Sequence, residues 1–147
     1  MATKETCKMR RACWDNEVAA FIKKVAETFT SADCTDGGST AGTYTFTEKI
    51  PADSLVLGCK YEVTTAFECT STCVATVGDG TTADLFGVTA SVKAAATVGC
   101  SAKYANNKSL PFVETATAPV VTITEDSDFG DVTAGEMTVS VYYIELN

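Results

Sequence analysis

The chain has 147 residues, 46% hydrophobic and 20% charged, which is typical of one globular domain with a substantial core. Its formal charge is −8. Residues 1–27 carry six basic and four acidic side chains (+2), and the other 120 residues carry five basic and fifteen acidic side chains (−10). Because residues 28–147 are strongly acidic, they are ill suited to bind nucleic-acid phosphates. Histidine is absent, which excludes Ser-His-Asp triads, Cys-His nucleophile pairs and histidine-containing zinc sites.

The sequence gives no sign of export or membrane insertion. No apolar run approaches the roughly 20 residues of a transmembrane helix, and the first residues, "MATKET", lack the apolar region of a secretory signal. We therefore expect no membrane partner. The seven cysteines are an odd number, so a complete disulfide framework is not the default expectation.

The first element expected is an N-terminal arm, residues 1–30, with a polar, basic start and one short amphipathic helix. Apolar residues recur there at spacings of three and four, the helical period. Asp15 or Asn16 could cap the helix. The apolar positions are Trp14, Val18, Phe21, Ile22, Val25, Ala26 and Phe29.

A linker loop is expected at 31–42, where "SADCTDGGSTAG" is small, polar and glycine-bearing. Residues 43–147 then alternate apolar and polar side chains in short segments between turn residues, with no helical segment interposed. This pattern predicts a mainly β domain, an antiparallel sandwich (jelly-roll-like) or a barrel. Strands are expected at 43–49, 55–68, 72–77, about 96–102, 111–117, 119–124 and 136–146.

Two strands carry explicit predictions of which side chains share a face. In 55–68 we expect the shared face to hold Leu55, Leu57, Cys59, Tyr61 and Val63, and in 136–146 to hold Met137, Val139, Val141 and Tyr143. Segment 72–77 is a candidate hairpin partner of 55–68.

The segment "VGDGTTADLFG" (77–87) has the glycines of a phosphate-binding loop, but no Lys or Arg lies between Lys60 and Lys93. A phosphate loop usually needs a cation nearby as well as backbone amides. We therefore expect a structural connection, with Phe86 folding back onto the core.

Two further clusters were considered as metal sites. A zinc site without histidine needs four thiolates. Cys7 and Cys13 are poorly spaced to join the pair Cys69-x-x-x-Cys73. We therefore expect Cys69 and Cys73 to be small buried side chains, with a Cys69–Cys73 disulfide as the alternative. The second cluster is acidic, with an incomplete calcium-loop pattern, and is expected to be a solvated turn. Its members are Glu125, Asp126, Asp128, Asp131 and Glu136. No catalytic, cofactor-binding or metal-binding residue is assigned.

Trp14, the only tryptophan, lies close to Arg10 and Arg11. Trp and Arg are enriched in binding hot spots, so this part of the arm could dock on an acidic partner surface. Alternatively, Trp14 packs the helix onto its own sandwich. The sequence does not favour either alternative.

Three segments resemble a loose class of tailed-bacteriophage virion proteins. They are "YTFTEKIPADSLVLGCKYEVTTAF", "VGDGTTADLFG" and "VVTITEDSDFGDVTAGEMTVSVYYIEL". Members share an IP-x-x-x-V/L-V-L-G strand, a VGDG…D-x-F loop and a terminal D-F-x-x-V-T-A-G-x-x-x-V-x-V-Y-Y hairpin. The resemblance covers about residues 43–146 and leaves out the cysteine-bearing segment 1–34.

The resemblance implies a β-sandwich structural protein, not an enzyme. We expect a capsid decoration (cement) protein, made in the host cytoplasm and placed on the capsid surface as a homo-oligomer, by expectation a trimer, that stabilises the major capsid protein lattice. The expected capsid contacts are Arg10, Arg11, Trp14, Phe21 and Ile22. The alternative is a tail, neck or fibre protein that binds a receptor or glycan through loop aromatics such as Tyr104 or Phe112, and a small hydrolase is a third, less favoured reading.

Overall fold

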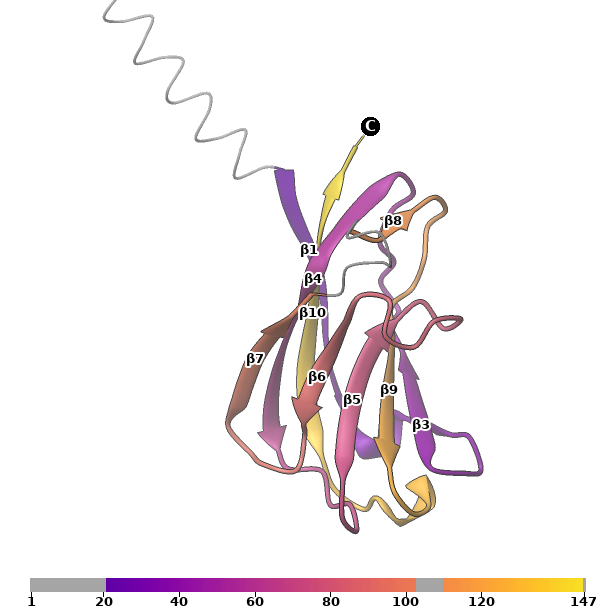
Figure 1. Ribbon diagram of the computed structural model, residues 1–147, viewed down its shortest axis with the longest axis vertical. Helices are drawn as coiled ribbons and strands as arrows, with labels where there is room; N and C mark the ends of the chain where they lie inside the picture. The colour runs from indigo at the N-terminus through magenta and orange to yellow at the C-terminus, as the bar shows by residue number, and fades with distance from the viewer. Residues whose placement is uncertain (1–20, 103–109, 147) are drawn as a thin grey trace, which may run out of the picture.

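The computed structural model describes residues 21–102 and 110–146, and within these ranges ten strands form two five-stranded antiparallel sheets. Sheet A has the order β1-β10-β4-β7, with β8 also paired to β4, and sheet B has the order β2-β3-β9-β5-β6. Figure 1 shows β3, β9, β5 and β6 in one layer and β1, β10, β4 and β7 in the other. The predicted antiparallel sandwich is confirmed.

The elements have the following bounds. Sheet A contains β1 (Ile22–Thr30), β4 (Ser54–Thr65), β7 (Thr97–Ser101), β8 (Phe112–Val113) and β10 (Glu136–Glu145). Sheet B contains β2 (Thr35–Asp36), β3 (Ala41–Thr45), β5 (Cys73–Gly78), β6 (Gly87–Ser91) and β9 (Val120–Glu125). Two short 3-10 helices are η1 (Ser31–Asp33) and η2 (Phe129–Asp131). No helix of the described residues is long and apolar enough to cross a membrane.

The core lies between the sheets, and β10 shows how the sequence specifies it. Met137, Val139 and Val141 are fully buried, and Tyr143 is nearly so, as the alternation predicts. Because β10 is flanked by β1 and β4, this face is covered by side chains from both neighbours as well as by sheet B. The face predicted for the last strand is therefore confirmed.

The amphipathic helix predicted up to residue 29 is wrong from residue 22 onward. Residues 22–30 form β1, which pairs with β10 over its whole length. The apolar residues that suggested a helical period are also consistent with a strand, because Val25 and Phe29 point inward and each is only 1% exposed. Pairing with a central strand outweighs the local helical pattern here. The predicted helical residues 14–20 lie outside the described residues.

The face predicted for β4 is correct only after a β-bulge. Tyr142 pairs with Gly58 and Tyr143 pairs with Val56, so Leu57 has no partner in the register. A bulge adds one residue and reverses the alternation. Val56 is therefore buried in place of Leu55 and Leu57, whereas the predicted inward residues after the bulge, Cys59, Tyr61 and Val63, are buried as expected.

Two other expectations about connectivity are corrected. Residues 31–42, predicted as a linker loop, contain η1, β2 and the start of β3. Strand β5, the candidate hairpin partner of β4, pairs instead with β6 and β9 in the other sheet. The chain thus crosses from one layer to the other between β4 and β5.

Glu27 of β1 ties the two sheets together. Its Oε2 accepts a hydrogen bond from the Tyr44 hydroxyl at 2.7 Å, and its Oε1 accepts bonds from the Thr47 hydroxyl and amide at 2.6 and 2.8 Å and from the Glu48 amide at 3.0 Å. Burial acts to raise the pKa of Glu27, but the hydrogen bonds from Thr47, Glu48 and Tyr44 outweigh it and lower the pKa. Phe29 stacks on the Tyr44 ring with centroids 4.4 Å apart, which strengthens the same junction.

Candidate interaction surface

Four apolar side chains form a row across the outer face of sheet A. Ile22 pairs with Ile144, Ile144 pairs with Leu55, and Leu55 pairs with Phe112. Residues directly opposite each other in antiparallel strands point to the same face. Ile22 is 51% exposed and Phe112 is 48% exposed. We call these four residues the apolar row; its position at the outside of a packed sheet leaves its apolar surface available to a partner.

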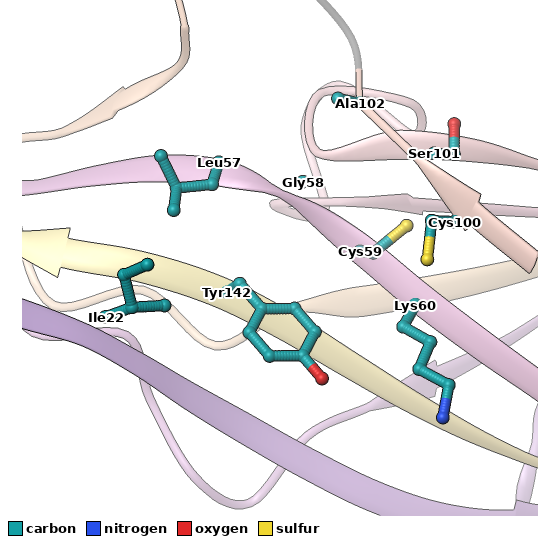
Figure 2. A pocket seen from close by; sticks show the side chains of 9 residues that line it. All are labelled: Ile22, Leu57, Gly58, Cys59, Lys60, Cys100, Ser101, Ala102 and Tyr142. Atoms are coloured by element: carbon teal, nitrogen blue, oxygen red, sulfur yellow. The ribbon is translucent and has the colours of Figure 1, made fainter. Parts of the chain in front are cut away.

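An open groove of about 610 Å³ adjoins the apolar row on sheet A. Figure 2 shows Ile22, Leu57 and Tyr142 at one part of it and Cys100 and Ala102, at the end of β7, at another. The lining is mostly apolar and is supplied by aliphatic, aromatic and cysteine side chains, together with Lys60 and Ser101. A concave, mostly apolar surface of this kind is suited to hold a large side chain of a partner segment.

The groove exists because of the β4 bulge. The reversed alternation turns Leu57 to the outer side, and Gly58, which has no side chain, lets Ser101 and Ala102 approach the strand closely. Gly58 has φ +148, and a Cβ there would lie 2.6 Å from the Ser101 carbonyl oxygen. Only glycine satisfies both restrictions without strain.

Charged side chains border the apolar row and the groove. Lys60 and Glu62, whose side chains approach to 4.0 Å, lie on this outer face. The exposed ion pair of Lys23 and Glu145, with an N–O distance of 2.6 Å, lies on the Tyr143 side of the strands, opposite the apolar row. Lys24, opposite Tyr142 on the edge strand, is exposed. An apolar centre with a charged border is the usual anatomy of a protein–protein contact.

The outer face of sheet B has a different character. Thr43 pairs with Thr122, and Thr122 pairs with Thr76, so three threonines lie side by side across β3, β9 and β5. The neighbouring positions Thr124 and Val74 continue this uncharged surface. We call it the threonine face. Its hydroxyl groups can bond to water, so it has less need of a partner than the apolar row.

The residues predicted to contact a capsid are only partly described. Arg10, Arg11 and Trp14 lie outside the described residues. Phe21 is 55% exposed, and Ile22 belongs to the apolar row. Sequence reasoning missed the companions of Ile22, namely Ile144 and Leu55, and placed Phe112 only in the alternative function. The signal that could have found them is the strand register, which is not visible in one sequence.

The segment 77–87 connects β5 and β6, as predicted. Asp79 Oδ1 accepts hydrogen bonds from the amides of Thr81 and Thr82 at 2.9 and 2.7 Å, which closes a tight turn. Gly80 supplies the positive φ of +86 that this turn requires. Phe86 is 1% exposed and packs into the core, which confirms the expectation for this side chain.

The five-residue loop from Cys69 to Cys73 is closed by a disulfide, which is the alternative considered for this pair. The Lys93 ammonium donates hydrogen bonds to the carbonyl oxygens of Ser71 at 2.7 Å and Cys69 at 3.1 Å. Asp126 Oδ1 accepts from the Ser71 amide at 3.1 Å and from the next amide along the chain at 2.9 Å. The loop is therefore held on both sides.

The acidic cluster considered for calcium serves this loop and the adjoining turn. A hydrogen bond from the Thr72 amide is the main reason that the pKa of Asp126 is lowered. Glu125 is 3% exposed, and its Oε2 accepts from the Thr70 amide at 3.2 Å. Asp128 caps η2 by accepting from the Gly130 amide. Within residues 21–102 and 110–146, no three Cys, Asp or Glu side chains are grouped as a metal site.

The remaining cysteines of the described residues are free thiols. Burial raises the pKa of Cys34 and of Cys59 to about 11, so both remain protonated and weakly nucleophilic at neutral pH. Cys100 is exposed and lines the groove. Cys7 and Cys13 lie outside the described residues.

Comparison with known structures supports the fold. The chain matches a chain of the cyanophage Pam1 capsid asymmetric unit with a TM-score of 0.59, at 21% identity, over 84% of each chain. A second match is to the acid-stable capsid structure of Helicobacter pylori bacteriophage KHP30, with a TM-score of 0.47 and 17% identity, over 86% of this chain and 94% of that one. Only the first is close enough in backbone geometry to carry an argument.

No protein-family model matches the sequence, and no curated protein matches it either. The structural match to the Pam1 capsid chain nevertheless confirms, at the level of the fold, the resemblance to virion β-sandwich proteins. A sandwich of this kind occurs in a phage capsid, with the same extent in both chains.

Proposed function

We propose that this protein is a structural component of a bacteriophage virion, specifically a capsid decoration (cement) protein without catalytic activity. The observation that carries the proposal is the fold shared with a chain of a cyanophage capsid over 84% of both chains. The apolar row supports it, because an exposed apolar row on the same face as Lys24, Lys60 and Glu62 fits a protein that works within an assembly.

The proposed partner is the major capsid protein, and the proposed state on the particle is a homo-oligomer, a trimer. The contact would be made by the N-terminal arm and the start of β1, with Arg10, Arg11, Trp14, Phe21 and Ile22 as the main residues. Phe21 and Ile22 are exposed, and Ile22 belongs to the apolar row, which supports a contact that includes both residues.

The physical effect of such a protein is mass action on the assembled lattice. A protein that binds only intact capsid stabilises it by about 2.7 kcal/mol per site at a free concentration of 100 times Kd. Many such sites on one shell add up, which is how a non-catalytic protein can oppose the internal pressure of packaged DNA.

The test is a binding assay on purified capsids that lack this protein, with the full chain and a variant that lacks residues 1–20. The truncation ends before β1, because β1 begins at Ile22 and supplies core residues. We expect the full chain to bind in hundreds of copies over the whole shell and the truncated chain, still folded by circular dichroism, to lose occupancy. Full occupancy by the truncated chain would refute the arm contact, and no binding by either chain would refute decoration.

The second candidate is a tail, neck or fibre protein that binds a receptor or glycan. The exposed Phe112 ring favours it, because an exposed aromatic ring can stack on a sugar. Tyr104, the other aromatic considered, lies outside the described residues. Electron microscopy of labelled virions distinguishes the candidates, since density over the whole lattice supports decoration and density at a single vertex supports tail or fibre.

A further inference from the structure

The groove on sheet A is open, and its rim is formed where the chain enters the sandwich. Ile22, the first residue of β1, lines it, and the preceding residue, Phe21, is exposed. Twenty residues precede Phe21. The segment that leads into β1 therefore starts at the edge of an unfilled apolar groove.

We propose that in the free protein residues 13–17 of the same chain lie in this groove, with the Trp14 indole on its apolar lining. Phe21 is seven positions after Trp14, and a chain of that length spans up to about 24 Å when extended, which leaves room for the segment to turn back toward the groove.

The charges of the segment and of the groove are complementary. Trp14 is followed by Asp15 and Glu17, whereas the groove is bordered by Lys24 and Lys60. Since the segment is tethered by a few residues, its effective concentration at the groove is in the millimolar range, which favours its own groove over that of a second copy.

The inference concerns the free protein and does not depend on the capsid assignment. It adds one consequence to that assignment: if Trp14 also contacts the capsid, the segment must leave the groove when the protein binds. Because the tests below contain no capsid, their failure is distinct from a failure of the proposed function.

The first test uses one cysteine on each side of the proposed contact. Cys13 adjoins Trp14 in sequence, and Cys100 is exposed in the groove. A disulfide requires Cα atoms about 4.4–6.8 Å apart, so docking should allow a Cys13–Cys100 bridge under mild oxidation of the full chain. We expect peptide mapping to find this bridge within monomers, and Cys100→Ser to abolish it, whereas Cys7→Ser leaves it.

Two results would overturn the proposal. A Cys13–Cys100 bridge found only between chains, as a dimer on a non-reducing gel, would assign the groove to a second copy. Oxidation that modifies Cys100 without ever joining it to Cys13 would show that the segment does not visit the groove.

The second test measures the fluorescence of Trp14, which is the only tryptophan and therefore the only source of this signal. We expect its emission in the full chain to be blue-shifted and several-fold less quenched by acrylamide than in a synthetic peptide of residues 1–20. Leu57→Lys should restore peptide-like quenching. Val74→Lys, an exposed position on the threonine face, is the matched control and should not.

Because Leu57→Lys could disturb folding, a second pair of variants reverses the charge of exposed lysines only. Lys24→Glu changes only an exposed side chain and should raise Trp14 quenching, whereas Lys49→Glu, also exposed, should leave it unchanged. Peptide-like quenching of the unaltered chain, or equal effects of all four variants, would refute docking.

Discussion

The two outer faces of the sandwich are built from the same kind of strand but present different chemistry. On sheet A, Ile22, Ile144, Leu55 and Phe112 form an exposed apolar row. On sheet B the corresponding side chains are largely threonines. The hydroxyl of an exposed threonine can hydrogen-bond to water, whereas an isoleucine or phenylalanine side chain loses the favourable free energy of burial when it stays in water. The difference makes sheet A the better candidate for a contact with a partner, whereas the surface of sheet B is compatible with solvent.

The largest effect is expected from a substitution on the inner face of β1, the strand whose outer face begins with Ile22 of the apolar row. Phe29 lies on the inner face of β1, is 1% exposed and stacks on Tyr44. Phe29→Ala should lower the free energy of unfolding by about 3–5 kcal/mol through lost burial and a cavity, measured by chemical denaturation. Thr28→Val, on the outer face of the same strand, is the control. Similar small changes for both would mean that β1 is not integrated into the core.

The next largest effect is expected on capsid binding, when a charge is placed on each of the two outer faces in turn. Ile22→Asp places a charge in the apolar row, and Val74→Asp places one on the threonine face, at positions that are both exposed. If sheet A contacts the capsid, Ile22→Asp should weaken binding by about 30-fold, equivalent to about 2 kcal/mol, and Val74→Asp should not. Titration of capsids with labelled protein measures both. A larger loss for Val74→Asp would reverse the assignment of the faces.

A smaller effect is expected from the junction between the sheets. The pKa of Glu27 is lowered from 4.5 in the folded state, despite the opposing effect of burial. A lowered carboxyl pKa contributes stability that is present above the unfolded value and is lost as the pH falls through the folded value. Glu27→Gln should therefore lower the unfolding midpoint at neutral pH and reduce the loss of stability on acidification below pH 4.5. Glu48→Gln, exposed and adjacent to the same junction, is the control. An unchanged pH profile for Glu27→Gln would contradict this explanation.

The smallest effect is expected on the threonine face itself. Thr122, at its centre, is half-buried between Thr43 and Thr76. Thr122→Val keeps the shape of the side chain and should change the free energy of unfolding by no more than about 0.5 kcal/mol, with unchanged capsid binding. A clear loss of binding would show that the threonine face also takes part in assembly.

Strands and inward-facing side chains could be predicted from the sequence where contacts between residues close in the chain determine them, and not where pairing with a distant strand does. The alternation in β10 is regular, and Met137 to Tyr143 were placed on the correct face. In β4 the same rule failed at Leu57, because a single bulge depends on pairing with Tyr142. In β1 the spacing of Val25 and Phe29 fits a helix or a strand, and the partner strand decides between them.

The candidate surface was predictable only in part for the same reason. Phe21 and Ile22 were selected as partner contacts, and both are exposed. Ile144 and Leu55, which complete the row with Ile22, lie far away in sequence and come together only through strand register. The groove was not foreseeable, since it results from the bulge at Leu57 and the conformation of Gly58.

The loop between Cys69 and Cys73 has a consequence for where the protein can mature. Its shape is fixed by the disulfide and also by Lys93, Glu125 and Asp126, which hold its carbonyl and amide groups. Reduction would remove the covalent link and leave these polar restraints in place. A newly made chain in a reducing compartment can therefore reach the same loop geometry before oxidation, and the bond can form later without rearrangement.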